Sequence, residues 1–436
     1  MQFLTETVEK IHTKNSSPLG KKFVISTTGG GYSSHYYLMS QPGASNTILE
    51  LNGPYARQAT LDLLNRDSKS KTSLDQFASI NAAQEMAEVS LKRAHKLLTM
   101  DCSRIEQLDC LKNGVGIGVA CALASSSWKR GEHRCHIVIA NSTQQIHFSL
   151  TLHKGIENNP FRTRQQEDEL CGHLVVFTVA VASGQMELSN VAVNMATYSN
   201  LSEYDKLVVN VIDNVNPIKQ LIEKQVNNVL YINGSMIQNV PLTLLGEYTD
   251  MKPKIVMLPG SFNPFHSGHK SALDSSLVQF DSSVGIYELC VSNVDKLSME
   301  YEEVLRRLDQ FKTTPIILTN TPRFMDKVVE FPGVSFAIGI DTAIRLIDPK
   351  YTNGDKKTMI DSIINMTSKG TLFFVTSRTY GVAGIPANFP LKLESTDLLT
   401  LSKITEFIPK IIPPFFIESI VIEFKDSPSS QLRKNQ

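Results

Sequence analysis

Residues 254–280 read KIVMLPGSFNPFHSGHKSALDSSLVQF, and this stretch decides the fold of the second half of the chain. The apolar run 254–258 predicts a strand, a loop rich in glycine and proline follows, and residues 270–280 predict a helix. Backbone N–H groups at a helix start attract phosphate, and Gly268 lets the backbone approach a ligand closely. The order strand, loop, helix therefore predicts a phosphate-binding turn.

His266 and His269 lie three residues apart in this turn. Both side chains can donate hydrogen bonds to phosphate oxygens as negative charge builds up on them. Such a pair suits an in-line displacement at phosphorus, which depends on positioning and electrostatics and needs no covalent intermediate.

The rest of the second half alternates apolar runs with helical or loop segments. The segment 300–312, for example, places Val304, Leu305, Leu308 and Phe311 on one helical face. This alternation predicts an α/β domain over 253–436 with a doubly wound parallel sheet. The apolar runs after the first are 286–291, 315–318, 335–338, 371–376 and 417–422.

The first half also predicts an α/β fold. A strand-like run at 23–25 leads into the glycine turn 29–31, and residues 81–99 carry apolar side chains at helical spacing. We expect a domain over 1–190 and a connector over 191–252, which is rich in Asn, Ser and Val. Further strands are expected at 114–121, 134–140 and 145–152, and a further helix at 162–182.

Composition excludes several classes of protein. The 436 residues exceed one ordinary core, so two domains are expected, and 42% hydrophobic with 20% charged residues is typical of globular chains. Lys+Arg and Asp+Glu both number 43, so no net charge favours nucleic acid as a partner. The first residues lack the apolar run of a secretory signal, and no run of 18 apolar residues suggests a membrane span. A cytoplasmic protein is expected, with the nucleus as the alternative.

Cysteine spacing argues against a metal centre. No CxxC pair occurs, so the spacing of a zinc site or a disulfide framework is missing, and we expect buried thiols in a reducing compartment and no metal held by protein side chains. The six cysteines are Cys102, Cys110, Cys121, Cys135, Cys171 and Cys290.

The segment GSFNPFHSGH at 260–269 resembles the signature of the HxGH nucleotidyltransferases, particularly the nicotinamide/nicotinate mononucleotide adenylyltransferases. The resemblance implies a Rossmann-like domain that joins a mononucleotide to AMP from ATP and releases pyrophosphate, as in NAD biosynthesis. Mg²⁺ would accompany the ATP. The resemblance assigns His266 and His269 to the transferring phosphates. It assigns the nucleotide to the loop residues Gly260, Ser261, Phe262, Asn263 and Gly268.

Two later segments are similar to motifs of the same family. FAIGID at 336–341 resembles a strand that ends in Gly-x-Asp, which implies that Gly339 and Asp341 contact the nucleotide; a strand followed by an N-cap aspartate is the alternative. DSPSSQLR at 426–433 resembles the motif that grips the ATP phosphates, although Pro428 stands where a serine belongs and Ser430 replaces threonine. A polar tail is the alternative there. The implied ATP contacts are Ser429, Ser430 and, as a catalytic residue, Arg433.

The acceptor stays open at this point. Asn293, Asp295 and Lys296 follow the second strand, where ligands of open α/β sheets bind, although a solvated loop fits equally well. The family stacks the pyridine ring on an aromatic, often tryptophan, but Trp128 lies in the other half, so Tyr351 or Phe262 would take that role. Another phosphate acceptor, of the phosphopantetheine or cytidylyl type, and a non-catalytic nucleotide-binding protein are the alternatives.

The first half, over roughly residues 5–185, is similar to the CinA C-terminal domain, the nicotinamide-nucleotide amidase fold. The similarity rests on Thr28-Gly29-Gly30 and on the turn 42–45, and it puts Ser26 at the nucleophile. Asn52 replaces a tyrosine, and Arg57 replaces the lysine that would activate the serine; a guanidinium stays charged and accepts no proton. We therefore expect the fold without the amidase, in a scaffold or as a homo-oligomer, with a phosphate cradle at Gly29–Gly31 as the alternative.

Overall fold

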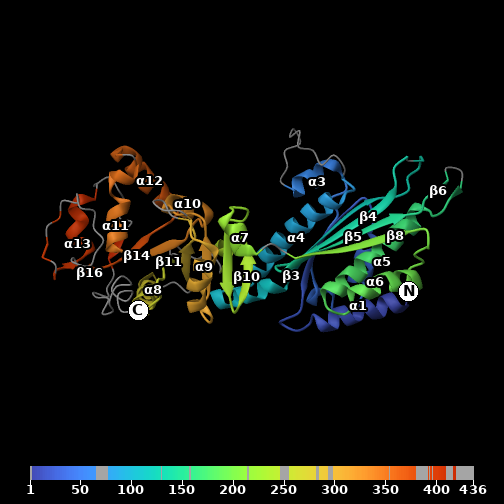
Figure 1. Cartoon of the computed structure of the whole chain (residues 1–436), viewed down its shortest axis with the longest axis horizontal. Helices are drawn as coiled ribbons and strands as arrows, with labels where there is room; N and C mark the ends of the chain where they lie inside the picture. Colours follow the sequence, from blue (N-terminus) through green and yellow to red (C-terminus); the bar gives the residue numbers. More distant parts are fainter. Residues whose placement is uncertain are drawn as a thin grey trace. The chain divides into compact units, whose positions relative to one another are not determined.

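The computed structural model divides the chain into two compact units (Figure 1). Unit 1 comprises Met1–Leu98 and Cys110–Asn214, and unit 2 comprises Thr99–Asp109 and Val215–Gln436. Each unit has its own sheet, so the predicted two-domain α/β class is confirmed. The described residues are 2–64, 77–128, 130–156, 159–213, 216–245, 255–280, 284–292, 298–352, 354–379, 391, 393–394, 396–408 and 416–418.

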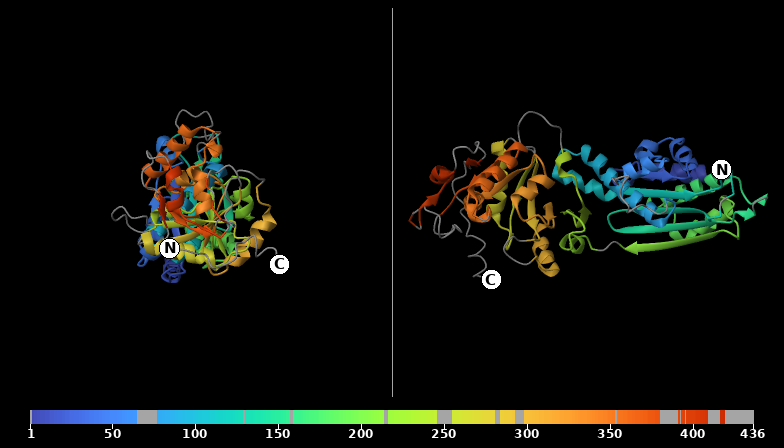
Figure 2. Two further views of the ribbon diagram at one scale, coloured as in Figure 1. Left: turned by 90° about the vertical axis from the view of Figure 1, so that its left-hand side faces the viewer. Right: turned by 90° about the horizontal axis from the view of Figure 1, so that it is seen from above.

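Unit 1 is built on a mixed six-stranded sheet in the order β2-β1-β3-β4-β5-β8. Strands β1 (Lys22–Thr28), β2 (Ile48–Asn52) and β3 (Gly114–Ala122) are parallel to one another. Strands β4 (His133–Ala140), β5 (Gln144–Leu152) and β8 (Lys206–Asp213) continue the sheet in antiparallel pairs and lie side by side in Figure 2.

Helices cover both faces of the unit 1 sheet, as Figure 1 shows. On one face, α1 (Gln2–Lys14), α5 (Arg164–Ala182) and α6 (Val191–Tyr198) bury their apolar side chains against the strands. On the other face, α4 (Ile80–Met100) packs against β3 and β4. Two shorter helices complete the unit, α2 (Ser33–Met39) and α3 (Arg57–Leu63).

Strand β3 alternates large apolar residues, which face α5, with glycines, which face α4. Val115, Ile117 and Val119 point into the core beneath α5. The glycines between them face α4, where a Cβ on Gly116 would lie 2.1 Å from the Ala87 carbonyl oxygen and a Cβ on Gly118 2.0 Å from that of Ala83. The alternation in GVGIGVACA therefore lets α4 approach the sheet closely.

Residues 191–252, expected to form a connector, are divided between the two units. Helix α6 and strand β8 belong to unit 1. Helix α7 (Pro217–Ile222) and the hairpin of β9 (Asn228–Ile232) and β10 (Ser235–Gln238) belong to unit 2. Strand β8 is an edge strand of the sheet, in which Leu207 and Val209 pack on the core while Val208, Val211 and Ile212 are exposed.

Unit 2 contains the predicted doubly wound sheet, with the order β10-β9-β13-β12-β11-β14-β15-β18. Numbered along the chain, its six parallel strands lie across the sheet in the order 3-2-1-4-5-6, with the reversal between β11 and β14. They are β11 (Ile255–Pro259), β12 (Val284–Cys290), β13 (Ile316–Thr319), β14 (Ser335–Gly339), β15 (Phe373–Thr376) and β18 (Phe416–Glu418).

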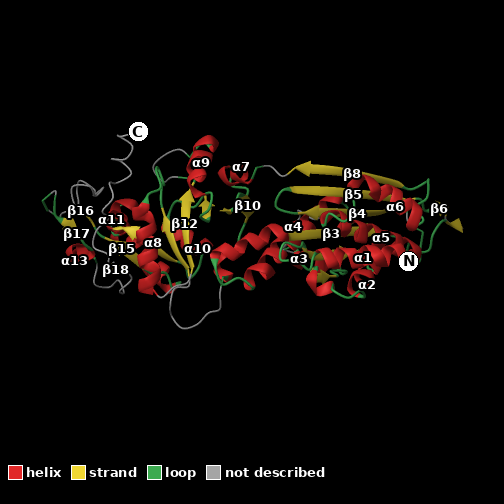
Figure 3. Cartoon of the chain, turned by 90° about the horizontal axis from the view of Figure 1, so that it is seen from below, coloured by secondary structure: helices red, strands yellow, loops and turns green. Residues whose placement is uncertain are grey.

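Helices alternate with these strands, as the colours of Figure 3 show. Helices α8 (Ser267–Phe280) and α9 (Tyr301–Leu308) pack on one face of the sheet, over a core that includes Val256, Leu258 and Leu289. The remaining helices of unit 2 are α10 (Phe324–Glu330), α11 (Ile340–Leu346), α12 (Lys356–Ser368) and α13 (Leu401–Ile404). Among the described helices, none is both long enough and apolar enough to cross a membrane.

Candidate functional site

The candidate site lies at the carboxyl ends of three neighbouring parallel strands of unit 2. Strand β11 pairs with β14, and β14 pairs with β15, so the segments that follow these strands meet at one edge of the sheet. They are the loop 260–266, residues 339–341 and residues 377–378. This edge is where the strand order reverses, which is the position at which open α/β sheets bind ligands.

The loop after β11 is fixed by the end of α9 and the short helix η5 (Asp309–Phe311). The Gln310 amide donates to the Phe262 carbonyl oxygen at 2.9 Å, and the Phe265 backbone N–H donates to Gln310 Oε1 at 2.7 Å. Arg307 Nη1 donates to the Ser261 carbonyl oxygen at 2.7 Å. These three bonds hold the loop in one shape before any ligand binds.

A pair of arginines on α9 adds a further clamp. Arg306 Nη2 donates to Asn263 Oδ1 at 2.7 Å. Glu303 forms ion pairs with Arg306 and Arg307, and hydrogen bonds from Arg306 are the main reason why the pKa of Glu303 falls to about 2. The side chain of Asn263, predicted to touch the nucleotide, is thus bound by Arg306 of α9.

Phe262 anchors the loop in the core. Its backbone adopts a left-handed conformation with φ of 44°, and its ring is fully buried at edge-on contacts with Phe265, Tyr287 and Phe311. A ring with no exposed surface cannot stack on a pyridine, so that suggested role for Phe262 is wrong. A Cβ on Gly260 would lie 2.5 Å from this ring, so glycine is needed there.

His266 and His269 lie together at the start of α8, with ring centroids 3.8 Å apart. The His266 backbone N–H donates to Nδ1 of His269 at 3.2 Å, so the neutral His269 ring carries its hydrogen on Nε2. Burial, with the charges of His266 and Arg378, lowers the pKa of His269 to about 3. At neutral pH His269 is therefore an uncharged hydrogen-bond donor.

Gly339 and Asp341 lie at the start of α11, directly after β14. A Cβ on Gly339 would lie 2.7 Å from Asp341 Oδ1, so the glycine leaves room for the carboxylate. Asp341 Oδ1 lies 3.7 Å from Nη1 of Arg378. The carboxylate that we predict at the nucleotide is thereby paired with Arg378, which belongs to none of the three motifs.

Arg378 is the residue that sequence reasoning missed. It lies two positions after the end of β15, and its charge contributes to the lowered pKa of His269. The sequence did carry a signal for this residue, because Arg378 lies two positions after the apolar run 371–376, at a carboxyl strand end. With Arg378 the site has two histidines and one arginine that can donate to phosphate oxygens, and a carboxylate, Asp341, that pairs with this arginine.

The remaining predicted residues of unit 2 are placed only in part. Tyr351 lies in the short helix η6 (Pro349–Thr352), which follows α11. Six candidates lie outside the described residues: Asn293, Asp295, Lys296, Ser429, Ser430 and Arg433.

In unit 1, Ser26 is buried on β1 and faces α4. Its Oγ lies 2.8 Å from Oγ of Ser90 on that helix. Asn52 and Arg57 replace the residues that would activate the serine, and both have other partners. The Asn52 amide donates to Glu50 at 2.8 Å, and the Arg57 guanidinium lies 5.7 Å from the ring centroid of Phe77. The hydroxyl is thus held inside the core.

The glycine turn of unit 1 holds a carboxylate of the chain itself. The backbone N–H groups of Gly31, Tyr32 and Ser33 donate to the Asp168 carboxylate on α5 at 2.7, 3.2 and 3.0 Å. The Arg164 guanidinium donates to the Gly29 carbonyl oxygen at 3.0 Å. Of the cradle considered at Gly29–Gly31, the Gly31 N–H group is therefore already satisfied by Asp168.

Comparison with known proteins gives partial similarities. No family model matches the chain. A segment of 70 residues, 15% of the chain, is 34% identical to the phosphopantetheine adenylyltransferase of Mycoplasma capricolum subsp. capricolum, and it spans about half of that relative, 48% of its length.

The similar solved structures include two competence-protein structures. One is the competence/damage inducible protein CihA from Agrobacterium tumefaciens, at 16% identity and a TM-score of 0.30, over 43% of this chain and 95% of that one. The other is a competence or damage-inducible protein from Enterobacter asburiae, at 13% identity and a TM-score of 0.30, over 42% of this chain and 98% of that one.

Proposed function

We propose that unit 2 is a nucleotidyltransferase that transfers AMP from ATP to an acceptor phosphate and releases pyrophosphate. The observation that carries the proposal is the His266–His269 pair on the turn after β11, with Arg378 and Asp341 at the neighbouring strand ends. The partial match to an adenylyltransferase supports the same reaction class.

The residues act by positioning and electrostatics. An oxygen of the acceptor phosphate attacks the α-phosphorus of ATP in line, a new P–O bond forms, and the bond to the β-phosphate oxygen breaks as pyrophosphate leaves. Nε2–H of the neutral His269 donates to an oxygen on which charge develops, and the fixed loop removes the cost of ordering the donor at that moment. Arg378 supplies positive charge beside it.

Mg²⁺ is proposed to arrive with ATP. The side chains of the site are mainly donors, and its carboxylate, Asp341, faces Arg378. This set fits phosphate oxygens better than it fits a metal ion, so the ion would be held by the phosphates and would neutralise part of their charge. Ser429, Ser430 and Arg433 are proposed as further contacts of the ATP phosphates.

Nicotinamide or nicotinate mononucleotide is the proposed acceptor, because the loop GSFNPFHSGH is similar to that family's signature. Phosphopantetheine is the second candidate, because the curated relative is named for it. Both acceptors present a phosphate monoester to the same histidines.

A substrate panel tests the proposal. The full chain is incubated with Mg²⁺, ATP or CTP, and each of nicotinamide mononucleotide, nicotinate mononucleotide and phosphopantetheine, and pyrophosphate release is measured. We expect release with ATP and a mononucleotide. Release with phosphopantetheine alone would select the second acceptor, and no release from folded protein with any pair would overturn the proposed function.

The variant His269→Ala tests whether pyrophosphate release comes from this site. Loss of one preorganised donor typically costs about 100-fold or more in turnover. His153→Ala is the matched control, because His153 is an exposed histidine of unit 1 and should leave turnover unchanged. Full activity in His269→Ala would contradict the role given to the pair.

A further inference from the structure

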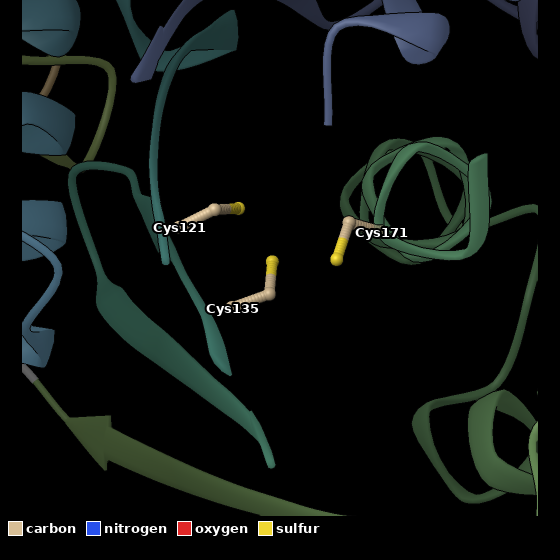
Figure 4. A group of neighbouring side chains, drawn as sticks. All are labelled: Cys121, Cys135 and Cys171. Atoms are coloured by element: carbon tan, nitrogen blue, oxygen red, sulfur yellow. The ribbon is translucent and has the colours of Figure 1, made fainter. Parts of the chain in front are cut away.

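Three cysteines that are far apart in the sequence lie together in the core of unit 1. Cys121 is on β3, Cys135 is on β4 and Cys171 is on α5, and their Sγ atoms all lie within 4.8 Å of one another. Figure 4 shows the two strand cysteines pointing toward the helix cysteine. The absence of a CxxC spacing gave no hint of this cluster, because the fold and not the local sequence assembles it.

The backbone keeps the three sulfurs in place. Cys121 and Cys135 are directly opposite each other in the antiparallel register of β3 and β4. Cys171 is fully buried on the α5 face of that pair, among the residues of the same core. Regular elements on both sides make the arrangement more rigid than a loop-built one.

We propose that Cys121, Cys135 and Cys171 form a binding site for a soft, thiophilic metal ion, with all three sulfurs as ligands. A metal–sulfur bond of about 2.3 Å puts sulfurs about 3.8 Å apart in a tetrahedral site and about 4.0 Å apart in a trigonal one. Both separations fall inside the 4.8 Å limit that the three Sγ atoms already satisfy. The sulfurs are therefore close enough to bind one ion with little movement of the backbone.

The donor set selects the class of ion. Three sulfurs favour ions such as Cu⁺ and Zn²⁺ over the hard ions Mg²⁺ and Ca²⁺. Within the part of the chain that the structure describes, no fourth histidine, cysteine or carboxylate joins the group within that distance. The cluster therefore lacks the four cysteines typical of an iron–sulfur centre, and an ion bound here has three protein ligands.

The raised pKa values of the three thiols argue against a redox switch at this cluster. Hydrogen bonds among the three thiols, together with burial in the core, raise the pKa of the Cys121, Cys135 and Cys171 thiols well above the usual range. Protonated thiols are poor nucleophiles and resist oxidation, which argues against a disulfide that forms and breaks. A metal ion instead displaces the thiol protons, so binding releases up to three protons per ion and strengthens as the pH rises.

The glycine turn of unit 1 lies directly against the cluster. A Cβ on Gly30 would lie 3.2 Å from Cβ of Cys121, and a Cβ on Gly31 would lie 3.7 Å from Cβ of Cys171. The fully buried side chain of Leu123 also lies against Gly30. The turn and Leu123 therefore enclose this side of the cluster.

The test is a metal titration of the full chain, reduced and stripped with a chelator under anaerobic conditions. Cd²⁺ serves as the probe for a divalent ion and Cu⁺, supplied from a competing chelator, as the probe for a monovalent one. We expect one equivalent of at least one probe to bind, with an ultraviolet thiolate-to-metal charge-transfer band, release of protons and a higher melting temperature. The probe that binds more tightly identifies the charge of the ion.

Variants assign the band to the cluster. Cys171→Ser and Cys135→Ser should each weaken binding by about 100-fold or more, beyond the 10- to 100-fold typical of outer-shell losses. Cys290→Ser, in unit 2, is the control and should bind as the parent does. Circular dichroism confirms that each variant is folded, and a Cys171→Ala variant replaces any that is not.

Two results would overturn the proposal. One is the absence of a charge-transfer band with both probes in the folded, reduced parent chain. The other is an unchanged band in the folded Cys171 and Cys135 variants, since the ion would then be bound elsewhere.

Discussion

Acidification from pH 7 to pH 5 should destabilise unit 2 through His269. The pKa of this ring is about 3 in the folded chain against an ordinary value of 6.5, mainly because burial removes water from it and also because His266 and Arg378 disfavour a positive charge there. Since the unfolded state then binds more protons than the folded state, stability falls as the pH drops below 6.5 toward 3.

The magnitude follows from the two pKa values. At pH 5 the unfolded ring is almost fully protonated and the folded ring almost fully neutral. The difference amounts to roughly 1.5 pH units at about 1.36 kcal/mol each, or about 2 kcal/mol of lost stability. At pH 7 the same contribution is close to zero, because the ring is neutral in both states.

The comparison of wild type with His269→Gln isolates this contribution. Glutamine does not titrate, and its amide oxygen can accept the hydrogen bond from the His266 backbone N–H. Denaturant unfolding followed by circular dichroism at both pH values should show that wild type loses about 2 kcal/mol more than the variant. Fluorescence of Trp128, the one tryptophan of the sequence, follows unit 1 separately.

His153→Gln provides the control and should reproduce the pH dependence of wild type. Equal losses of stability in wild type and His269→Gln between pH 7 and pH 5 would refute the reasoning. The ring would then have the same pKa in the folded and unfolded chains. The surroundings of His269 would not be what keeps it neutral.

Three further predictions concern Arg378, Asp168 and Ser26. Arg378→Ala should lower the rate of nucleotidyl transfer by about 100-fold and raise the pKa of His269, measured as a shift of the acid limb of the pH–rate profile. Arg378→Lys keeps the positive charge and should keep that pKa lowered. An unchanged rate in Arg378→Ala would show that Arg378 takes no part in the site. Asp168→Ala should lower the free energy of unfolding of unit 1 by about 2 kcal/mol or more, because three backbone N–H groups lose their acceptor. Denaturant unfolding followed by Trp128 fluorescence measures this, with Gln165→Ala, a change of an exposed side chain, as the control. Equal midpoints in Asp168→Ala and wild type would contradict the prediction. The full chain should release no ammonia from nicotinamide mononucleotide, because the Ser26 hydroxyl is buried against Ser90 and Arg57 cannot act as a base; ammonia release that Ser26→Ala abolishes would show the opposite.

The core strands of unit 2 could be predicted because each is covered on both faces. Strands such as β11 and β15 are therefore continuous apolar runs, and the turn after β11 carries a motif with a local physical cause. The alternation of strands and helices predicts a doubly wound parallel sheet, whereas the order 3-2-1-4-5-6 is known only from the structure.

The features that sequence reasoning missed all depend on contacts between distant segments. Asp168 reaches the glycine turn across 135 or more residues, and Cys171 meets Cys121 only because α5 lies on β3 and β4. Strand β8 lies in the segment predicted to be a connector, because its place in the sheet depends on pairing with the distant strand β5. The spacing of apolar residues in a short segment shows which of its side chains are buried. It does not show which distant segment they meet, and these features depend on such meetings.

The carboxylate in the glycine turn of unit 1 acts as a tethered competitor. Asp168 is attached to the same chain, so its effective concentration at the three N–H groups does not depend on dilution, and even short flexible tethers reach about the millimolar range. A free anion could occupy the turn only by exchange with this side chain. The turn is therefore self-liganded, and a simple titration with phosphate would report the free-energy difference between two acceptors instead of the intrinsic affinity of the turn.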